Sequence, residues 1–361
     1  MSTSAHQLAG TCHVFLAIEV GLSIDLQRAQ RDLQGAGRAR LPSVRNPAGL
    51  DWSDPPLTLE QDGPAIEVEG HRASSVVQVR IFDFGAISLS YRFDFAAPVD
   101  DLIRLGAALS SPGSLLQDGR ARASSLLEAL GAAVRRPALS DFTEDYIVFA
   151  VRQVSGAAAG PSDEDLARIL RAEPARLGEQ ETRDCVSASV SYGPSDRAVI
   201  DWNATMLIDE APESSLDVLE FANVELLEFR ALDAQLDAAL EEAWGSVSGR
   251  AGAAARYRTG HRELKRVAAL QMDAALLYEE INNALKLLGD QFLARLYRAA
   301  SRRMHLDEWE RATLRKLETL DSIYAKMADT QAHRRAELLE WIIIALISAE
   351  IVFSLVTFFR G

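Results

Sequence analysis

A chain of 361 residues with 48% apolar residues is long enough for two domains, or for one domain with long helices, and this excludes an intrinsically disordered protein. The net charge of −14 argues against general nucleic-acid binding by the acidic body of the chain. Two cysteines, Cys12 and Cys185, are too few for a disulfide framework or a cysteine zinc site, so we expect no metal and no cofactor.

The first 210 residues contain the strand signals. Short runs rich in β-branched and aromatic residues, bounded by turn residues, predict β-strands. These runs cover 13–21, 76–95, 145–154 and 197–209. Gly85 divides the second run, which therefore reads as a hairpin or as a strand with a tight break.

Helical stretches alternate with these strands. Apolar residues at helical spacing predict helices at 23–34, 98–110, 124–134 and 161–173. Ser162 with Asp165 three residues later resembles a capping box at the start of the last of these helices. Residues 35–64 are rich in Gly, Pro and charge and are typical of a long loop. The fold class that we expect is α+β, with a mixed α/β domain over 12–210.

From Ser214 the pattern is helical. Residues 214–244 contain no Pro and predict a connecting helix. Glu225 and Glu228 lie three apart on it, as do Glu220 and Asn223, and paired carboxylates on helices can bind metals. Metal-binding bundles also need a histidine on such helices, and 214–244 has none, so these residues are expected to form a solvated acidic face.

After a linker at 245–255, two series of residues alternate three and four apart. The first runs from Leu264 to Phe292 and the second from Thr313 to Trp341. Such spacing is typical of a coiled coil, and two runs with a short break predict an antiparallel helical stalk over 256–340.

The second series continues into the apolar stretch 341–359. Its nineteen residues would extend about 28 Å as a helix, close to the thickness of a bilayer core. This predicts a single C-terminal transmembrane helix, with the membrane as a partner, although a buried helix of a soluble domain is the alternative. His333, Arg334 and Arg335 precede the stretch and place the bulk of the chain on the cytoplasmic side.

Glu350 lies in the middle of this stretch. With Ser354 and Thr357 it forms a polar stripe, and Ala345, Ser348 and Ala349 form a patch of small residues, both suited to association with another helix. These residues and the edge residue Trp341 make up the expected association site, and a homo-oligomer through the stalk and the tail is expected. The alternative is a protonated Glu350 that apolar neighbours tolerate.

Basic residues cluster around the break between the two helical series. They are Arg295, Arg298, Arg302, Arg303, Arg311, Arg315 and Lys316. Solvated helix faces explain most such clusters, and the alternative is a contact with an anionic partner, either RNA or an acidic protein. No nucleophile elbow, phosphate-binding loop or zinc-protease motif is present in the sequence, so no catalytic residue is assigned.

Several segments together resemble a known family. They are "VRIFDFGAISL" (79–89), "IDWNATMLID" (200–209), "VLEFANVELLEF" (218–229) and the helical region that ends in "LEWIIIALISAE" (339–350). These resemble the required for meiotic nuclear division family, over most of residues 75–356. The resemblance implies a membrane-associated domain of unknown function, mitochondrial in eukaryotes and tied to organelle translation. The composition suggests a bacterial member, in the inner membrane.

The sequence thus predicts a non-enzymatic, C-terminally anchored scaffold or tether, linked by the resemblance to the translation machinery. The alternative is an enzyme of unrecognised type with its site in the N-terminal domain. A cleft that contains titratable groups with perturbed pKa values would favour the enzyme.

Overall fold

The computed structural model describes residues 7–33, 37–38, 55–111, 113–155, 161–193, 196–247, 269–272, 274 and 291–360. The chain divides into two compact units. The first, here called unit 1, combines Met1–Leu232 with Asp273–Arg311. The second, unit 2, combines Asp233–Met272 with Ala312–Gly361.

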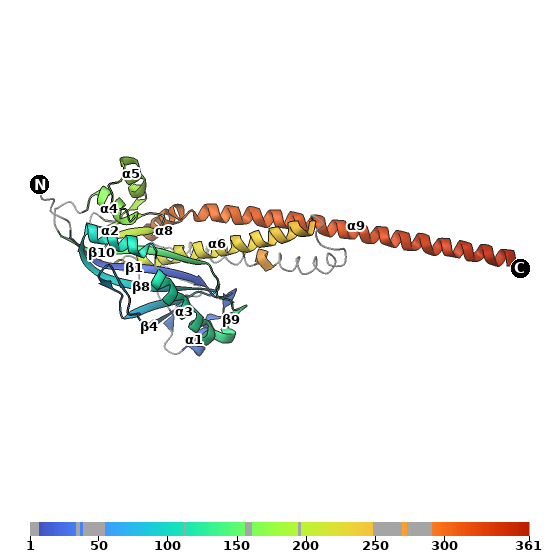
Figure 1. The fold of residues 1–361 in the computed structure, drawn as a ribbon, viewed down its shortest axis with the longest axis horizontal. Coiled ribbons are helices and arrows are strands. Elements are labelled where there is room, and N and C mark those ends of the chain that lie inside the picture. The colour runs from blue at the N-terminus through green and yellow to red at the C-terminus, as the bar shows by residue number, and fades with distance from the viewer. Residues whose placement is uncertain are drawn as a thin grey trace. The chain divides into compact units, whose positions relative to one another are not determined.

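Unit 1 is built on one large sheet (Figure 1). In the described residues its nine strands follow the order β11-β12-β13-β10-β1-β8-β7-β4-β3. Their bounds are β1 Gln7–Glu19, β3 Gly37–Arg38, β4 Leu57–Asp62, β7 Val76–Ile81, β8 Ala86–Pro98, β10 Thr143–Ser155, β11 Ser189–Val190, β12 Arg197–Ile200 and β13 Ala204–Ile208. All neighbours are antiparallel except β10 and β13, which are parallel. Two small ladders accompany the sheet, β2 (Ser23–Ile24) with β9 (Val134–Arg135) and β5 (Glu67–Val68) with β6 (His71–Arg72).

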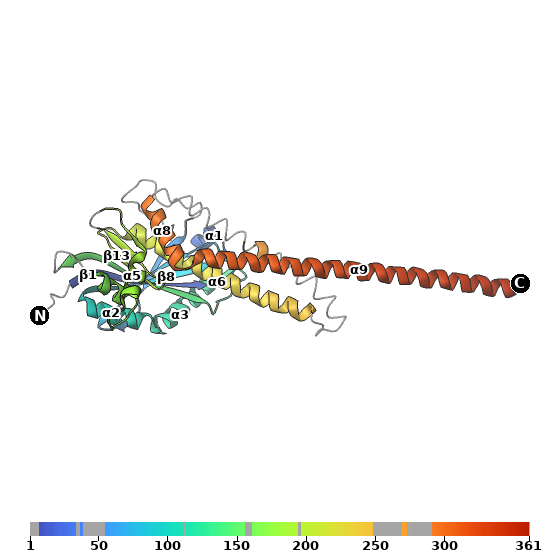
Figure 2. The same cartoon turned by 90° about the horizontal axis from the view of Figure 1, so that it is seen from above.

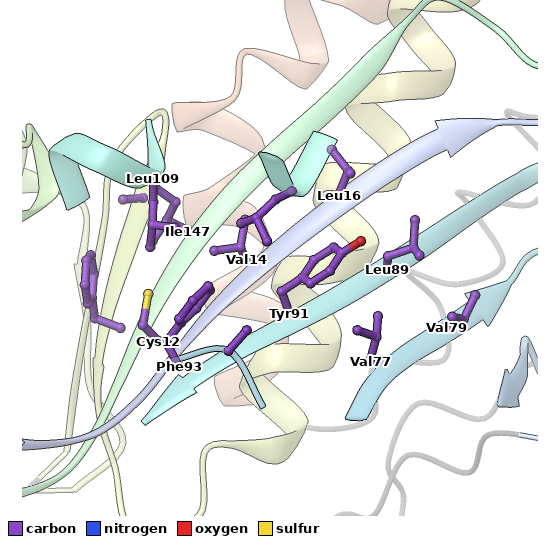
Figure 3. Packing of buried hydrophobic residues seen from close by; sticks show 14 of the residues in the cluster. Cys12, Val14, Leu16, Val77, Val79, Leu89, Tyr91, Phe93, Leu109 and Ile147 are labelled. Carbon is purple, nitrogen blue, oxygen red and sulfur yellow. The ribbon is translucent and has the colours of Figure 1, made fainter. Parts of the chain in front are cut away.

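The first strand, β1, lies at the centre of the sheet between β8 and β10. Side chains of a strand alternate between the two faces, and here both faces are covered. Cys12, Val14 and Leu16 point to one face and join the main apolar core, as Figure 3 shows beside Tyr91 and Leu89 of β8. The other face holds polar side chains as well as apolar ones. The helices that pack on it therefore contribute polar partners too.

The helices of the first face all come before residue 190. They are α1 (Leu26–Asp32), α2 (Val99–Leu109), α3 (Gly113–Leu130) with the 3-10 turn η1 (Gly131–Ala133), α4 (Asp163–Leu170) and α5 (Glu179–Ser187). Their apolar stripes enter the same core as β1, for example through Leu102, Leu115 and Leu166. The predicted capping box is present, because the Ser162 hydroxyl and the Asp165 carboxylate cap α4 reciprocally.

Helices α6 (Glu213–Val247) and α8 (Gln291–Arg303) belong to the second face. Figure 2 shows α8 on the opposite side of the strands from α2 and α3, and α8 packs against β11 and β12. Arg80 of β7 pairs with Asp217 and, at 2.8 Å, with Glu220 of α6. The expectation of a solvated acidic face on α6 is therefore wrong. Glu220, Asn223 and Glu225 are each 3% exposed or less, because polar groups of the sheet and of α8 lie opposite them.

Unit 2 consists of the C-terminal part of α6, residues 269–272 and most of α9 (Leu306–Arg360). Of the residues that the coiled-coil spacing singled out on α9, Thr313, Leu317, Leu320 and Tyr324 are buried, whereas Trp341 at the end of the series is 72% exposed. Lys316 binds Asp233 and Asp237 of α6 at 2.7 and 2.6 Å. Most of the predicted linker 245–255 and of the first half of the predicted stalk lies outside the described residues.

The prediction of a membrane anchor is wrong. Over the part of the chain that the structure describes, no helix combines the length and the apolarity that crossing a bilayer requires. Residues 341–359 are the end of α9, and the uncharged run between Glu340 and Glu350 is only about 14 Å long against about 30 Å of bilayer core. The predicted transmembrane end of the fold, the membrane as partner and the single-pass inner-membrane localisation are corrected accordingly.

Candidate functional site

Helix α8 has two chemically different faces. Its sequence, QFLARLYRAASRR, contains no acidic residue and spaces its apolar residues three and four apart. The buried face carries Phe292, Leu293, Leu296, Tyr297, Ala299 and Ala300. The exposed face carries Arg295, Arg298 and Arg302. The helix is therefore held from one side and open to solvent on the other.

On the buried face, Tyr297 is bonded to α6. Its hydroxyl donates a hydrogen bond to the Glu225 carboxylate at 2.5 Å, and Glu225 is 3% exposed. Burial raises the pKa of Glu225 to about 8, the hydrogen bond from Tyr297 opposes this, and the carboxylates of Glu310 and Asp307 add to the rise. Burial, followed by the charge of Glu225, raises the pKa of Tyr297. The phenol therefore stays a donor at physiological pH.

At the end of α8, Arg303 turns inward to the α/β body. Its Nε donates to the Ile200 carbonyl at 3.3 Å, and its Nη2 donates to the carbonyls of Cys185 at 3.2 Å and of Asp184. The guanidinium also pairs with the carboxylates of Asp184 at 3.2 Å and Asp201 at 3.5 Å. One side chain thus links α8 to both α5 and the end of β12.

Asp201, which is 1% exposed, lies at the centre of this cluster. Arg171, next to the end of α4, pairs with the same carboxylate and with Asp184 at 2.9 Å. The Tyr146 hydroxyl donates to the Asp201 carbonyl at 2.8 Å. Burial, with the Asp201 charge second, raises the pKa of the neighbouring Cys185 thiol to about 12, so this cysteine is not a thiolate nucleophile.

The outer face of α8 is formed by Arg295, Arg298 and Arg302, which we call the arginine surface. At about 100° per residue the three side chains leave the helix within an arc of about 60°. Arg295 donates to the Ser191 carbonyl at 3.3 Å, and Arg298 and Arg302 donate to carbonyls of their own helix at 3.0 and 3.2 Å. Among the described residues none of the three has a carboxylate partner. The three side chains are exposed to solvent.

Two exposed aromatic residues are chain neighbours of residues that contact α8. Tyr192 follows Ser191, its ring meets Phe292 edge to face at 6.0 Å, and it is 62% exposed. Trp202, which is 58% exposed, follows Ile200 and Asp201, both of which contact Arg303. Aromatic rings and guanidinium groups are the side chains that most often dominate binding surfaces.

Comparison with known proteins identifies the family. The family model described as "Uncharacterized protein MJ0711, N-terminal domain" matches residues 9–215, more than half of the chain. The chain belongs to this family. It is 24% identical over 200 residues to "Uncharacterized protein MJ0711" of Methanocaldococcus jannaschii, covering 53% of this chain and 58% of that protein. The chain therefore spans little more than half of this relative's length. No solved structure matches the chain.

The MJ0711 family match covers the body that holds α8 and ends before α8 itself. Asp184, Ser191, Tyr192, Asp201 and Trp202 lie inside the matched range, whereas α6 from residue 216 onward and α8 lie outside it. The match therefore covers the domain against which α8, the helix with the arginine surface, packs.

The other predicted basic residues do not join this surface. Arg303 turns inward, as described above, and Arg311 faces Asp307 at 3.8 Å on the first turns of α9. Arg315 is exposed on α9 and Lys316 is paired with Asp233 and Asp237, and both belong to unit 2. The sequence cluster thus separates into three solvent-facing arginines on α8 and four residues with other surroundings.

The residues of the predicted association site lie on α9. Trp341 is 72% exposed, and Ala345, Ser348, Ala349 and Glu350 are exposed as well. Ser354 and Thr357 continue the same helix, and their side chains lie outside the described residues.

Other buried acids fasten α6 to the sheet. Burial raises the pKa of Glu144 to about 7 against the opposing charge of Arg230, and that of Asp217 to about 6 against the charge of Arg80. Glu144 pairs with Arg230, and the Asn223 amide donates to the Glu144 carbonyl at 3.3 Å. In the described part of the chain, no three His, Cys, Asp or Glu side chains are grouped so that they could hold a metal ion.

Sequence reasoning missed the partners of α8. It placed the arginines in a cluster but did not distinguish the inward-facing Arg303 from the exposed arginines. It also did not predict that Tyr192 and Trp202 lie near α8. One signal was readable, because Arg295, Arg298 and Arg302 follow the helical spacing on the side away from Leu293, Leu296 and Tyr297. The aromatic neighbours come from loops about 100 residues earlier.

Proposed function

We propose that this protein is a non-enzymatic scaffold that binds an anionic partner through the arginine surface of α8. The observation that carries the proposal is the contrast between the two faces of this helix. Its inner face is fixed by Tyr297 and Arg303 to residues of α6, α5 and β12, and its outer face presents three cations without carboxylate partners among the described residues. A surface fixed before binding loses little conformational entropy when the partner arrives.

The alternative, an enzyme with its site in the α/β domain, has less support. The buried acids with raised pKa values are Glu144, Asp217 and Glu225, and each contacts a partner side chain that ties one helix to another element. Perturbed pKa values favour a catalytic site when the groups line a cleft. Here burial of these acids at contacts between a helix and another element explains their raised pKa values.

We also propose that the protein is a distant relative of the required for meiotic nuclear division family. The segment 79–89 forms the end of β7, a turn at Gly85 and the start of β8, and it lies within the matched residues 9–215. This placement supports a shared domain, and the assignment to a bacterial branch rests on composition.

Retention on immobilised heparin tests the scaffold proposal, because heparin is a polyanion without bases. We expect that replacing Arg295, Arg298 and Arg302 together with glutamine lowers the salt concentration at which the protein elutes. The matched control replaces Arg31, Arg135 and Arg136, three exposed arginines at α1 and β9, with glutamine. This control carries the same charge change, so it should elute later than the α8 variant and close to the parent protein. Equal elution of the two triple variants would show that net charge, and not α8, governs retention.

A further inference from the structure

We propose that the arginine surface, together with Tyr192 and Trp202, binds single-stranded nucleic acid. This inference rests on the proposed function and names the class of its anionic partner. The arginines would hold phosphates, and the two aromatic rings would stack on bases at either end of α8.

The charge of the site fits a phosphate backbone. Arg295, Arg298 and Arg302 cover about 10 Å along the helix axis, and the helix that carries them has no acidic residue. Two carboxylates of the segments that contact α8 have partners of their own. Asp184 binds Arg303 and Arg171, and Asp196 accepts the backbone N–H groups of Tyr192 and Gly193. Guanidinium groups bind phosphate oxygens in fork geometry better than ammonium groups do.

Further carboxylates on the first turn of α9 are also engaged. Glu308 lies 2.6 Å from the His305 ring, and Asp307 faces Arg311 at 3.8 Å. A chain with a net charge of −14 repels polyanions overall, so binding should be confined to the place where positive charge is concentrated and open. The arginine surface meets that condition.

The aromatic residues favour a single strand over a duplex and over an acidic protein. Base stacking needs an exposed ring and an unpaired base, and Tyr192 and Trp202 are 62% and 58% exposed. A duplex buries the faces of its bases, so it would contact the arginines alone. An acidic protein would likewise use the arginines and gain little from the rings. The pairing of a cationic helix face with flanking rings is the combination found in sequence-tolerant single-strand binders.

Fluorescence anisotropy with labelled probes tests the inference on the full chain. The probes are an oligouridylate and an oligothymidylate of about 12 nucleotides, an RNA duplex of the same length, and a polyglutamate peptide. The variants are the α8 triple arginine-to-glutamine protein, Tyr192→Ala and Trp202→Ala. The controls are the α1/β9 triple variant and Trp244→Ala, which removes a 71% exposed aromatic of unit 2. Circular dichroism melting checks that each variant folds.

We expect the protein to bind the single strands more tightly than the duplex and the peptide. The α8 variant should lower the slope of log affinity against log salt by about 2, since each phosphate contact contributes about 0.7 for a single strand. Each aromatic truncation should weaken binding at least about fivefold, and the controls should bind like the parent. Comparison of the two oligonucleotides shows whether RNA or DNA is preferred.

The outcomes that overturn the inference are distinct from those that overturn the scaffold proposal. If heparin retention depends on α8 but the aromatic variants bind the oligonucleotides as the parent does, or the peptide or duplex binds as well as the single strands, the single-strand inference is wrong and the scaffold stands. If the α8 variant changes neither heparin retention nor oligonucleotide binding, both are wrong.

Discussion

The hydroxyl of Tyr297 on α8 donates to the carboxylate of Glu225 on α6 across 2.5 Å, in a place where Glu225 has almost no contact with water. Asp307 and Glu310 on α9 add negative charge nearby. The contact fixes the inner face of α8, and it makes that attachment sensitive to the charge of one carboxyl group.

Stability should fall as the pH rises toward 8. Burial raises the pKa of Glu225 in the folded protein to about 8, whereas a free Glu has a pKa of about 4.3. Between these values the folded state holds a proton that the unfolded state has lost, so the free energy of unfolding decreases by up to about 1.4 kcal/mol per pH unit. Urea unfolding at several pH values should show this decrease, and Glu225→Gln should reduce the slope. Glu144 and Asp217, with pKa values raised to about 7 and 6, contribute to the slope in both proteins. Equal slopes would contradict the assignment to Glu225.

Tyr297→Phe should destabilise the protein by about 1–3 kcal/mol, because it leaves the Glu225 carboxyl group buried without its hydrogen-bond partner. The hydrogen bond from Tyr297 lowers the pKa of Glu225, so the same change should also move the pH-dependent decrease to higher pH. Trp244→Phe, at a position 71% exposed, is the control and should leave the urea midpoint unchanged. A midpoint that shifts equally in both variants would count against the Tyr297–Glu225 contact.

Arg303→Ala and Arg302→Ala should differ sharply although the residues are neighbours. Loss of Arg303 removes one of the two arginine partners of the buried Asp201 carboxylate and the contacts to three backbone carbonyls, and leaving buried polar groups unsatisfied costs about 1–3 kcal/mol. The change at Arg302, on the exposed face, should stay within about 0.5 kcal/mol. Thermal and urea unfolding measure the difference. Comparable losses for both variants would show that Arg303 is not a structural contact.

Gly10→Ala should destabilise the sheet, because a Cβ at this position would lie 2.0 Å from the Ala150 carbonyl oxygen. The position adjoins the register shift between β1 and β10, where the backbones approach closely. We expect a loss of about 1–3 kcal/mol, the range for overpacked interiors. Gly113→Ala at the start of α3, where no atom lies within 4 Å of the new Cβ, should be neutral or slightly stabilising. Chemical denaturation of both variants decides.

Local chemistry was readable from the sequence. Gly85 was expected to mark a break, and it separates β7 from β8 with a φ of +101°, a conformation that glycine adopts without strain. Ser162 and Asp165 cap α4 as their spacing indicated. These features depend on residues within a few positions of one another, so composition and spacing predict them.

Features that depend on distant residues were not readable. The long loop expected over 35–64 contains β4, whose pairing with β7 is nonlocal. The acids of α6 look like a solvated face until Arg80, 137 residues before Asp217, and Tyr297, 72 residues after Glu225, are placed opposite them. The composition of the apolar end of the chain predicts a membrane span, and the described part of the structure corrects this prediction. The arginine cluster was found, but which arginines face water follows only from the packing of α8.

The central position of β1 has a consequence for the order in which the protein is made. Phe15 pairs with Ser90 of β8 and with Tyr146 of β10, which are 75 and 131 positions further along the chain. At about 5–20 residues per second, a ribosome needs roughly 4–15 s to reach the first partner and still longer to reach the second. During that delay the apolar strand β1 has unpaired backbone N–H and C=O groups, and such an unpaired strand favours aggregation. Chaperone dependence of folding during synthesis should therefore be strongest before residue 155 has left the ribosome.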